Sequence, residues 1–102
     1  MTLEKAAKDM QELITKHGFT YEGELTWDGQ QIFTRHWKKM VQVVWYGEHE
    51  STLDIKVSMS YGCPKVRIIR DGRPDDKIRD YSSPKRCFNA IAEIVRIAGF
   101  EM

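Results

Sequence analysis

The chain has 102 residues, of which 41% are hydrophobic and 30% charged, and its formal net charge is +1. This length suits one domain that buries a core without metal or disulfide staples, and three Trp, four Tyr and four Phe argue against intrinsic disorder. The small net charge excludes a global electrostatic field for nucleic acid or an acidic membrane, but it allows a local patch. No apolar run reaches the roughly 20 residues that span a bilayer.

Cysteine usage and the first residues of the chain bear on the expected compartment. Cys63 and Cys87 belong to no CxxC pair, so a disulfide is possible in principle but not implied. The first residues lead straight into an amphipathic helix and contain no signal sequence. We therefore expect a cytoplasmic protein with reduced thiols.

Amphipathic helices are expected near both ends of the chain. From residue 3 to 17, apolar residues recur at spacings of three and four, and Gly18 is placed to end the helix. In the last segment, Ser83 is a good N-cap, Pro84 suits the first helical position, and residues 87–98 carry the apolar stripe. Each helix therefore has one apolar face that must cover another surface.

Between the helices, large apolar residues from position 19 to 61 fall mostly on odd positions. Side chains alternate across a strand, so a shared parity indicates an antiparallel sheet with one buried face. Trp37 and Trp45 share this parity, so both are expected under the helices. The pattern predicts five strands, namely residues 19–27, a segment ending at 37, 41–46, 52–61, and a segment from 66 to 70.

Turn residues set the expected connections between these strands. Turns are predicted at residues 27–29 and 38–40, loops at residues 47–51 and 62–65, and one long connection at residues 72–83. These lengths keep odd positions together on one face.

The same lengths fix an expected register. It places Phe33 opposite Gly23 and Trp45 opposite Leu53. The sequence therefore predicts an α+β domain over residues 1–102, in two layers: a helix, a five-stranded antiparallel meander and a second helix. Both helices are expected on the odd-residue face.

The other face of the sheet should be polar, yet Ile32, Val44 and Tyr46 fall on it. In the expected register Ile32 lies across from Tyr46, and Thr34 across from Val44. A contiguous exposed apolar patch often marks a partner surface. Alternatively, such residues simply suit strands on either face, or a helix covers them. The candidate partner-binding residues are Ile32, Met40, Val44, Tyr46 and Ile69.

A second candidate surface is basic. Residues 1–54 hold six Lys/Arg and nine Asp/Glu, whereas residues 55–102 hold ten and six. Cationic side chains contact phosphates and an aromatic ring stacks on a base, although salt bridges to the interleaved aspartates explain the same pattern. The candidate nucleic-acid-binding residues are Arg67, Arg70, Arg73, Arg79, Tyr81, Lys85 and Arg86.

Signatures of catalysis are missing from the sequence. It contains no GxSxG, HExxH, Walker A or GxGxxG motif, so no catalytic residues and no cofactor are expected. The three histidines have no carboxylate or cysteine at ligand spacing, so no metal site is expected. Cys87 falls on the buried stripe of the last helix, where thiols are usually inert.

The order helix, strands, helix is similar to that of double-stranded-RNA-binding domains, and Lys85 and Arg86 match the lysine-rich start of their final helix. That family has three strands where five are expected here, so its function is not carried over. In size and in lacking an active site, the chain is similar to accessory proteins of phages and mobile elements that inhibit a host complex. We therefore expect a non-enzymatic module that binds a protein partner or a second copy of itself. The alternative is a nucleic-acid-binding domain.

Overall fold

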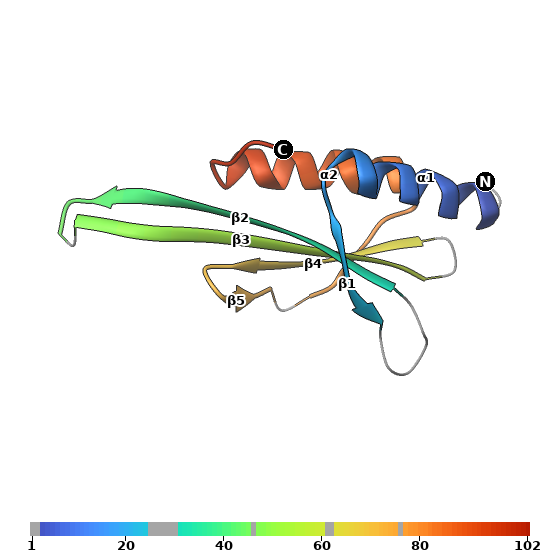
Figure 1. The fold of residues 1–102 in the computed structure, drawn as a ribbon, viewed down its shortest axis with the longest axis horizontal. Helices are drawn as coiled ribbons and strands as arrows, with labels where there is room; N and C mark the ends of the chain where they lie inside the picture. The colour runs from blue at the N-terminus through green and yellow to red at the C-terminus, as the bar shows by residue number, and fades with distance from the viewer. Residues whose placement is uncertain (1–2, 25–30, 46, 61–62, 76) are drawn as a thin grey trace.

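The computed structural model describes residues 3–24, 31–45, 47–60, 63–75 and 77–102. It confirms the predicted α+β architecture, with a helix at each end and an antiparallel sheet in meander order between them (Figure 1). The short β6 (Arg79–Asp80) lies off the meander and pairs with β4 (Cys63–Arg70). The elements are α1 (Leu3–Lys16), β1 (Thr20–Glu24), β2 (Gln31–Val43), β3 (Gly47–Ser60), β4 (Cys63–Arg70), β5 (Arg73–Pro74), β6 (Arg79–Asp80) and α2 (Pro84–Ile97).

The helix ends follow the predicted signals. The Ser83 side chain accepts a hydrogen bond from the Arg86 amide of α2 at 3.3 Å, and Pro84 occupies the first turn. After α1, Gly18 adopts a left-handed φ of 73°. The Phe19 amide then donates to the Ile14 carbonyl at 3.0 Å, which folds the buried Phe19 ring back beneath the helix. Neither helix in the described part of the chain is long and apolar enough to cross a membrane.

One core joins the helices to the sheet. Figure 1 shows both helices on the same side of the sheet. Trp37 is buried on this side, as the parity predicted, and it contacts the Phe19 ring edge-on. The buried core residues are Met10, Ile14, Phe19, Trp37, Leu53, Ile55, Val57, Val66, Ile68, Cys87, Phe88, Ile91, Ile94 and Val95.

The predicted turn at residues 38–40 is wrong, because β2 runs through it without a break. The predicted loop at residues 47–51 is also wrong, because it forms the first part of β3. Trp37, not Trp45, therefore lies opposite Leu53. The Lys-Lys-Met segment has no glycine, proline or asparagine to enforce a turn, and an alternating pattern alone does not separate one long strand from two short ones.

Other connections differ in detail. A bulge in β1 places Phe33 opposite Tyr21 and Ile32 opposite Gly23, so the predicted Phe33–Gly23 pair does not form. Strand β4 begins at Cys63, so the predicted loop at residues 62–65 is wrong at positions 63–65. The predicted turn at residues 27–29 lies outside the described residues.

The β4–β5 connection is a tight turn. Asp71 and Gly72 both have positive φ, 51° and 80°, which is the geometry that twisted hairpins prefer. The Asp71 carboxylate also accepts a hydrogen bond from the Thr52 amide at 2.9 Å. This turn ends β4 while the neighbouring β3 continues, so the sheet narrows to two strands at this point.

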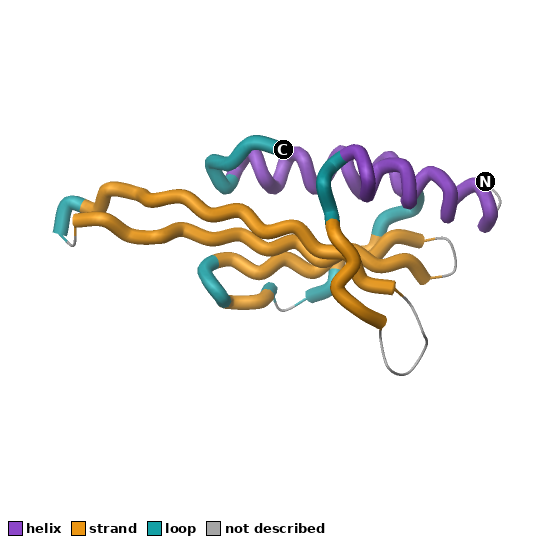
Figure 2. Tube along the Cα trace, viewed as in Figure 1, coloured by secondary structure: helices purple, strands orange, loops and turns teal. Residues whose placement is uncertain are grey.

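The molecule is elongated, with extents of 52 × 26 × 21 Å. Figure 2 shows why: the β2–β3 hairpin projects beyond α2 and beyond the end of β4. We call residues 40–52 of this hairpin the arm; its Tyr46 lies outside the described residues. No described residue of the arm belongs to the buried core.

Candidate functional site

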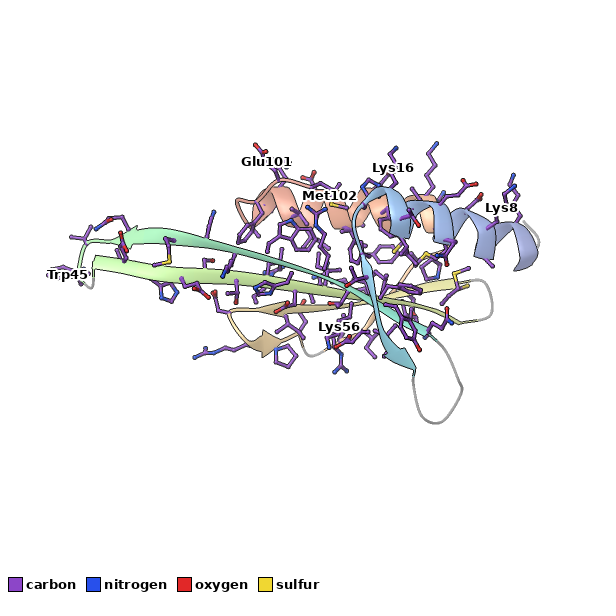
Figure 3. All side chains as sticks on the ribbon, in the orientation of Figure 1. Lys8, Lys16, Trp45, Lys56, Glu101 and Met102 are labelled. Atoms are coloured by element: carbon purple, nitrogen blue, oxygen red, sulfur yellow. The ribbon has the colours of Figure 1, made fainter. Side chains whose placement is uncertain are left out.

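The tip of the arm carries the most exposed large apolar side chains described in the structure. Val44 is 92% exposed and Trp45 is 89% exposed, while Met40 further down the arm is 58% exposed. The prediction that Trp45 lies under the helices is therefore wrong, since the long β2 moves it to the hairpin turn. Figure 3 shows Trp45 at the far end of the hairpin, away from both helices.

The two faces of the arm differ in charge. On the face away from the helices, Met40 pairs across the hairpin with Glu50, and Gln42 pairs with Glu48. Lys38 lies on the same face beside them. These three charged side chains are exposed, and none forms an ion pair within the part of the chain described here.

The face toward the helices is nearly uncharged. Val41 pairs with His49, and Val43 pairs with Gly47. Both valines are only partly buried, because α2 and β4 end before this point and no other layer in the described structure covers them. The arm therefore combines apolar side chains with a free acidic pair, Glu48 and Glu50.

The base of the arm is held by the segment that follows α2. The Trp37 indole Nε1 donates to the Glu101 carbonyl at 3.0 Å, and Lys39 Nζ donates to the Gly99 carbonyl at 2.9 Å. The Lys39 ammonium also lies 4.8 Å from the centre of the Phe100 ring. Side chains from one face of β2 thus bind the main chain of residues 99–101.

Arg35 extends the same arrangement toward α1. Its guanidinium donates to the His17 carbonyl at 2.8 Å and to the main-chain oxygen of Met102 at 3.4 Å. It also stacks 4.5 Å from the Trp37 ring centre. Arg35, Trp37 and Lys39, at alternate positions of β2, therefore fix residues 99–102 over the strand from which the arm extends.

The structure does not assemble the predicted partner-binding patch. Ile32 lies at the start of β2 opposite Gly23, and Met40 lies eight positions further along the same strand, about 26 Å away at about 3.3 Å per residue. Ile69 lies on β4 opposite Asp54. Val44 is at the hairpin tip, and Tyr46 lies outside the described residues. Of the predicted set, only Met40 and Val44 are both described and brought into one region.

The predicted register of this face also fails. Thr34 pairs with Lys56 and Thr20, and not with Val44. The face is instead polar near its centre, where Lys56 pairs with Glu22 at 2.6 Å. The predicted patch depended on a turn at residues 38–40, and it disappears with that turn.

The predicted basic surface is divided by ion pairs. Arg79 pairs with Asp75 at 3.5 Å, and the neighbouring Lys65 pairs with Asp80 at 2.9 Å. Tyr81 packs against the core. These contacts match the salt-bridge interpretation for this part of the loop.

The remaining basic candidates lie on three different elements. Arg67 is on β4 opposite Lys56, and Lys85 and Arg86 are exposed in the first turn of α2. Arg70 and Arg73 lie directly opposite each other beside the β4–β5 turn. Both are exposed, and within the described residues neither forms an ion pair.

The thiols and the apolar pocket beneath α1 offer no recognisable chemistry. Cys63 is exposed and Cys87 is buried, both are free, and burial raises the pKa of the Cys87 thiol to about 12. A pocket of about 180 Å³ between α1, the start of β2 and the end of β3 is lined by apolar, amide and hydroxyl side chains with no titratable group among them. The described residues contain no cluster suited to a metal ion.

The sequence did not predict a long projecting hairpin, so it did not predict the arm or its exposed tip. Three of its residues, Met40, Val44 and Tyr46, were candidates, but Tyr46 lies outside the described residues and Trp45 was assigned to the core. Comparison with known proteins adds no assignment, because no protein-family model, no curated protein and no solved structure matches the chain.

Proposed function

We propose that the chain is a small non-enzymatic protein-binding module and that the β2–β3 arm is its docking element. The observation that carries this proposal is the near-complete exposure of Val44 and Trp45, 92% and 89%, at the end of a hairpin with no core beneath it. Tryptophan is enriched among the residues that dominate binding energy at protein interfaces. Its exposure here favours a surface that is covered in a complex.

The charges of the arm indicate the kind of surface that would cover it. Glu48 and Glu50 are exposed beside Met40 and carry no cationic partner within the described residues. Electrostatic complementarity guides partner choice and association rate. A matching surface would have an apolar pocket for Trp45 and cationic groups near its rim.

A photo-crosslinking amino acid at position 45 tests the proposal, with the same amino acid at position 97 as the control. Ile97 is 70% exposed and lies on α2, outside the arm. Expressed in the source cells and irradiated, the position-45 variant should form a discrete protein adduct that the position-97 variant lacks. Mass spectrometry of the adduct then identifies the partner protein.

Each outcome of this experiment decides the proposal. An adduct with a second copy of the chain or with another protein supports it. A subunit of a cellular complex would match the accessory or inhibitor role expected of phage and mobile-element proteins. Equal adducts at both positions, or adducts with nucleic acid alone, would count against an arm that docks on protein.

A second candidate, a nucleic-acid-binding domain, is favoured by one observation. Arg70 and Arg73 are exposed and directly opposed, although like charges in this position repel each other. A bound phosphate would offset that repulsion. Gel shifts over a salt series should then show binding that weakens steeply with salt and is lost in the Arg70→Glu, Arg73→Glu variant. Absence of binding to single- and double-stranded DNA and RNA would exclude it.

A further inference from the structure

The outer edge of β2 is free along most of its length. Strand β1 pairs with β2 only at residues 31–34. From Arg35 to Val43, no strand in the described part of the chain pairs with this edge. A long edge with unpaired backbone groups is a template for another strand. The edge ends at β1 on one side and at the exposed arm tip on the other.

The outer edge of β3 is different, because it is protected by charge. Strand β4 leaves this edge free at residues 47–52, where Glu48 and Glu50 are exposed. If two copies paired here in a register centred on residues 48–50, these carboxylates would lie opposite one another. Like charges directly opposite each other destabilise a sheet. This edge is therefore a poor place for self-association.

We infer that a second copy of the chain adds to the outer edge of β2, antiparallel to it, about a two-fold axis at Met40. The inference rests on the proposed function, because it names the partner of the same arm. In this register Lys39 lies opposite the partner's Val41, and Lys38 lies opposite the partner's Gln42. No two like charges are opposed.

The length of the free edge fits this arrangement. Of the nine free residues 35–43, an axis at Met40 pairs seven, 37–43, with the same seven of the partner, and it brings the partner's Trp45 level with Arg35. The partner's Trp45 then arrives beside a guanidinium, with which an indole ring interacts favourably. The partner's Val43 lies beside Trp37. Each copy therefore places its Val43 and Trp45 against side chains of the other.

The charges on the face away from the helices also complement each other across the axis. Lys38 lies diagonally from Glu50 of its own hairpin. Opposite Lys38 is the partner's Gln42, and next to that residue on the partner's β3 is the partner's Glu48. The two lysines thus lie on the inner strands and the four carboxylates on the outer strands, within reach of long side chains.

In a two-fold contact each residue contributes buried area from both copies, so even a small arm can form a large interface. Two buried indoles contribute about 300–500 Å² of the roughly 1,200 Å² that the smallest stable interfaces bury. The remainder would come from both copies of Met40, Val41, Val43 and Val44 and from the paired backbone. Such an interface closes on itself, so it gives a dimer and not a filament.

Cysteine cross-linking tests the register directly. In a Cys63→Ser background, Met40→Cys places two thiols on the two-fold axis, where opposed Cα atoms lie about 4.5–5.5 Å apart, within disulfide range. Under mild oxidation we expect at least tenfold more cross-linked dimer from Met40→Cys than from Gln42→Cys. The latter lies on the same face of the same strand, but two residues from the axis.

A head-to-tail contact between β2 and β3 would give a different result. There, Met40→Cys alone would not cross-link, but its mixture with Glu48→Cys would, and this outcome would overturn the two-fold arrangement. Failure of all three cysteine variants to cross-link would overturn strand pairing by a second copy.

Sedimentation equilibrium provides the second measurement. The parent chain should approach twice its 12.0 kDa mass as concentration rises. Met40→Glu places two carboxylates on the axis and should weaken association at least tenfold, whereas the control Ile97→Glu on α2 should leave it unchanged. A parent chain that stays monomeric to about 1 mM would overturn the inference. If position 45 still cross-links to another protein, the proposed function survives; if it does not, both fail.

Discussion

At the scale of single residues, Trp37 and Trp45 show how position decides the role of a tryptophan. Trp37 is buried, donates its indole N–H to the Glu101 carbonyl and carries the Arg35 guanidinium on its ring. Trp45 is almost fully exposed to solvent. The same substitution at the two positions should therefore have different effects on stability.

Trp37→Phe should lower the free energy of unfolding by about 1–2 kcal/mol, through loss of one hydrogen bond and of part of the ring packing. Trp45→Phe is the matched control and should change it by less than about 0.5 kcal/mol. Urea unfolding followed by circular dichroism measures both values. Equal effects would mean that the contact with Glu101 does not stabilise the fold.

Gly99 is constrained by its backbone. Its φ is 85°, a left-handed conformation that alanine adopts only at a cost, whereas the Lys39 ammonium that a Cβ would meet is the end of a flexible side chain and can move aside. Gly99→Ala should therefore destabilise the chain by about 1–2 kcal/mol. Gly23→Ala is the control, because a Cβ there would meet no atom within 4 Å. Thermal unfolding measures the melting temperatures of the two variants. A Gly99→Ala variant as stable as the Gly23→Ala control would contradict the constraint.

His17 should make stability depend on pH. Burial, with smaller contributions from Lys16 and Arg35, lowers the pKa of this imidazole, which stacks on Phe88. The unfolded chain then binds the proton more readily than the folded chain. Neutral His17 therefore makes its full contribution to the free energy of unfolding above the unfolded pKa of about 6.5. This contribution is lost as pH falls through the lower pKa of the folded chain. His17→Gln should flatten the fall in melting temperature below about pH 6.5, and an unchanged slope would argue against it.

At the scale of elements, the arm is separable from the core. None of its described residues belongs to the buried cluster, and Lys39 and Ser51 form a cross-strand pair at its base. Replacing residues 40–50 by Asn-Gly would close the hairpin there with a favoured two-residue turn. This variant should keep a cooperative melt and lose both self-association and position-specific docking. A variant that unfolds would show that the arm is structural.

The elements themselves were largely predictable from sequence. Caps and apolar stripes located both helices, and alternation identified Leu53, Ile55 and Val57 as the buried face of β3. Hairpin lengths were not predictable, because Lys38 to Met40 alternates as a strand does whether or not the chain turns there. Local pattern defines which face is buried, but long-range pairing decides where a long strand ends.

The same ambiguity explains what was missed in the candidate site. Trp45 has the parity of a core residue, and only the extended β2 carries it past the last helix. Met40 and Val44 were proposed for the right reason, as apolar residues without cover, but next to the wrong neighbours. One further signal in the sequence could have indicated that β3 starts early. Glu48 and Glu50 alternate with His49, and this pattern is compatible with a strand as well as with a loop.

At the scale of the whole molecule, the arm determines the shape. The radius of gyration is 14.8 Å, compared with about 13 Å for a compact chain of 100 residues. Small-angle scattering of Met40→Glu, which keeps the arm and blocks the inferred contact, should therefore give a radius near 14.8 Å. The variant with residues 40–50 replaced should fall to about 13 Å. Equal radii for the two variants would mean that the arm folds back in solution.

The hydrogen bonds to residues 99–102 determine which substitutions in this segment should be tolerated during evolution. Arg35, Trp37 and Lys39 bind main-chain oxygens, which every amino acid possesses. Exchanges at the exposed position 101 should therefore be tolerated in descendants of this gene. Gly99 and the three donors on β2 should resist change, and Phe100 and Met102, which pack against the core, should stay apolar. A variable position 101 between apolar neighbours is the pattern to look for when diverged sequences are compared.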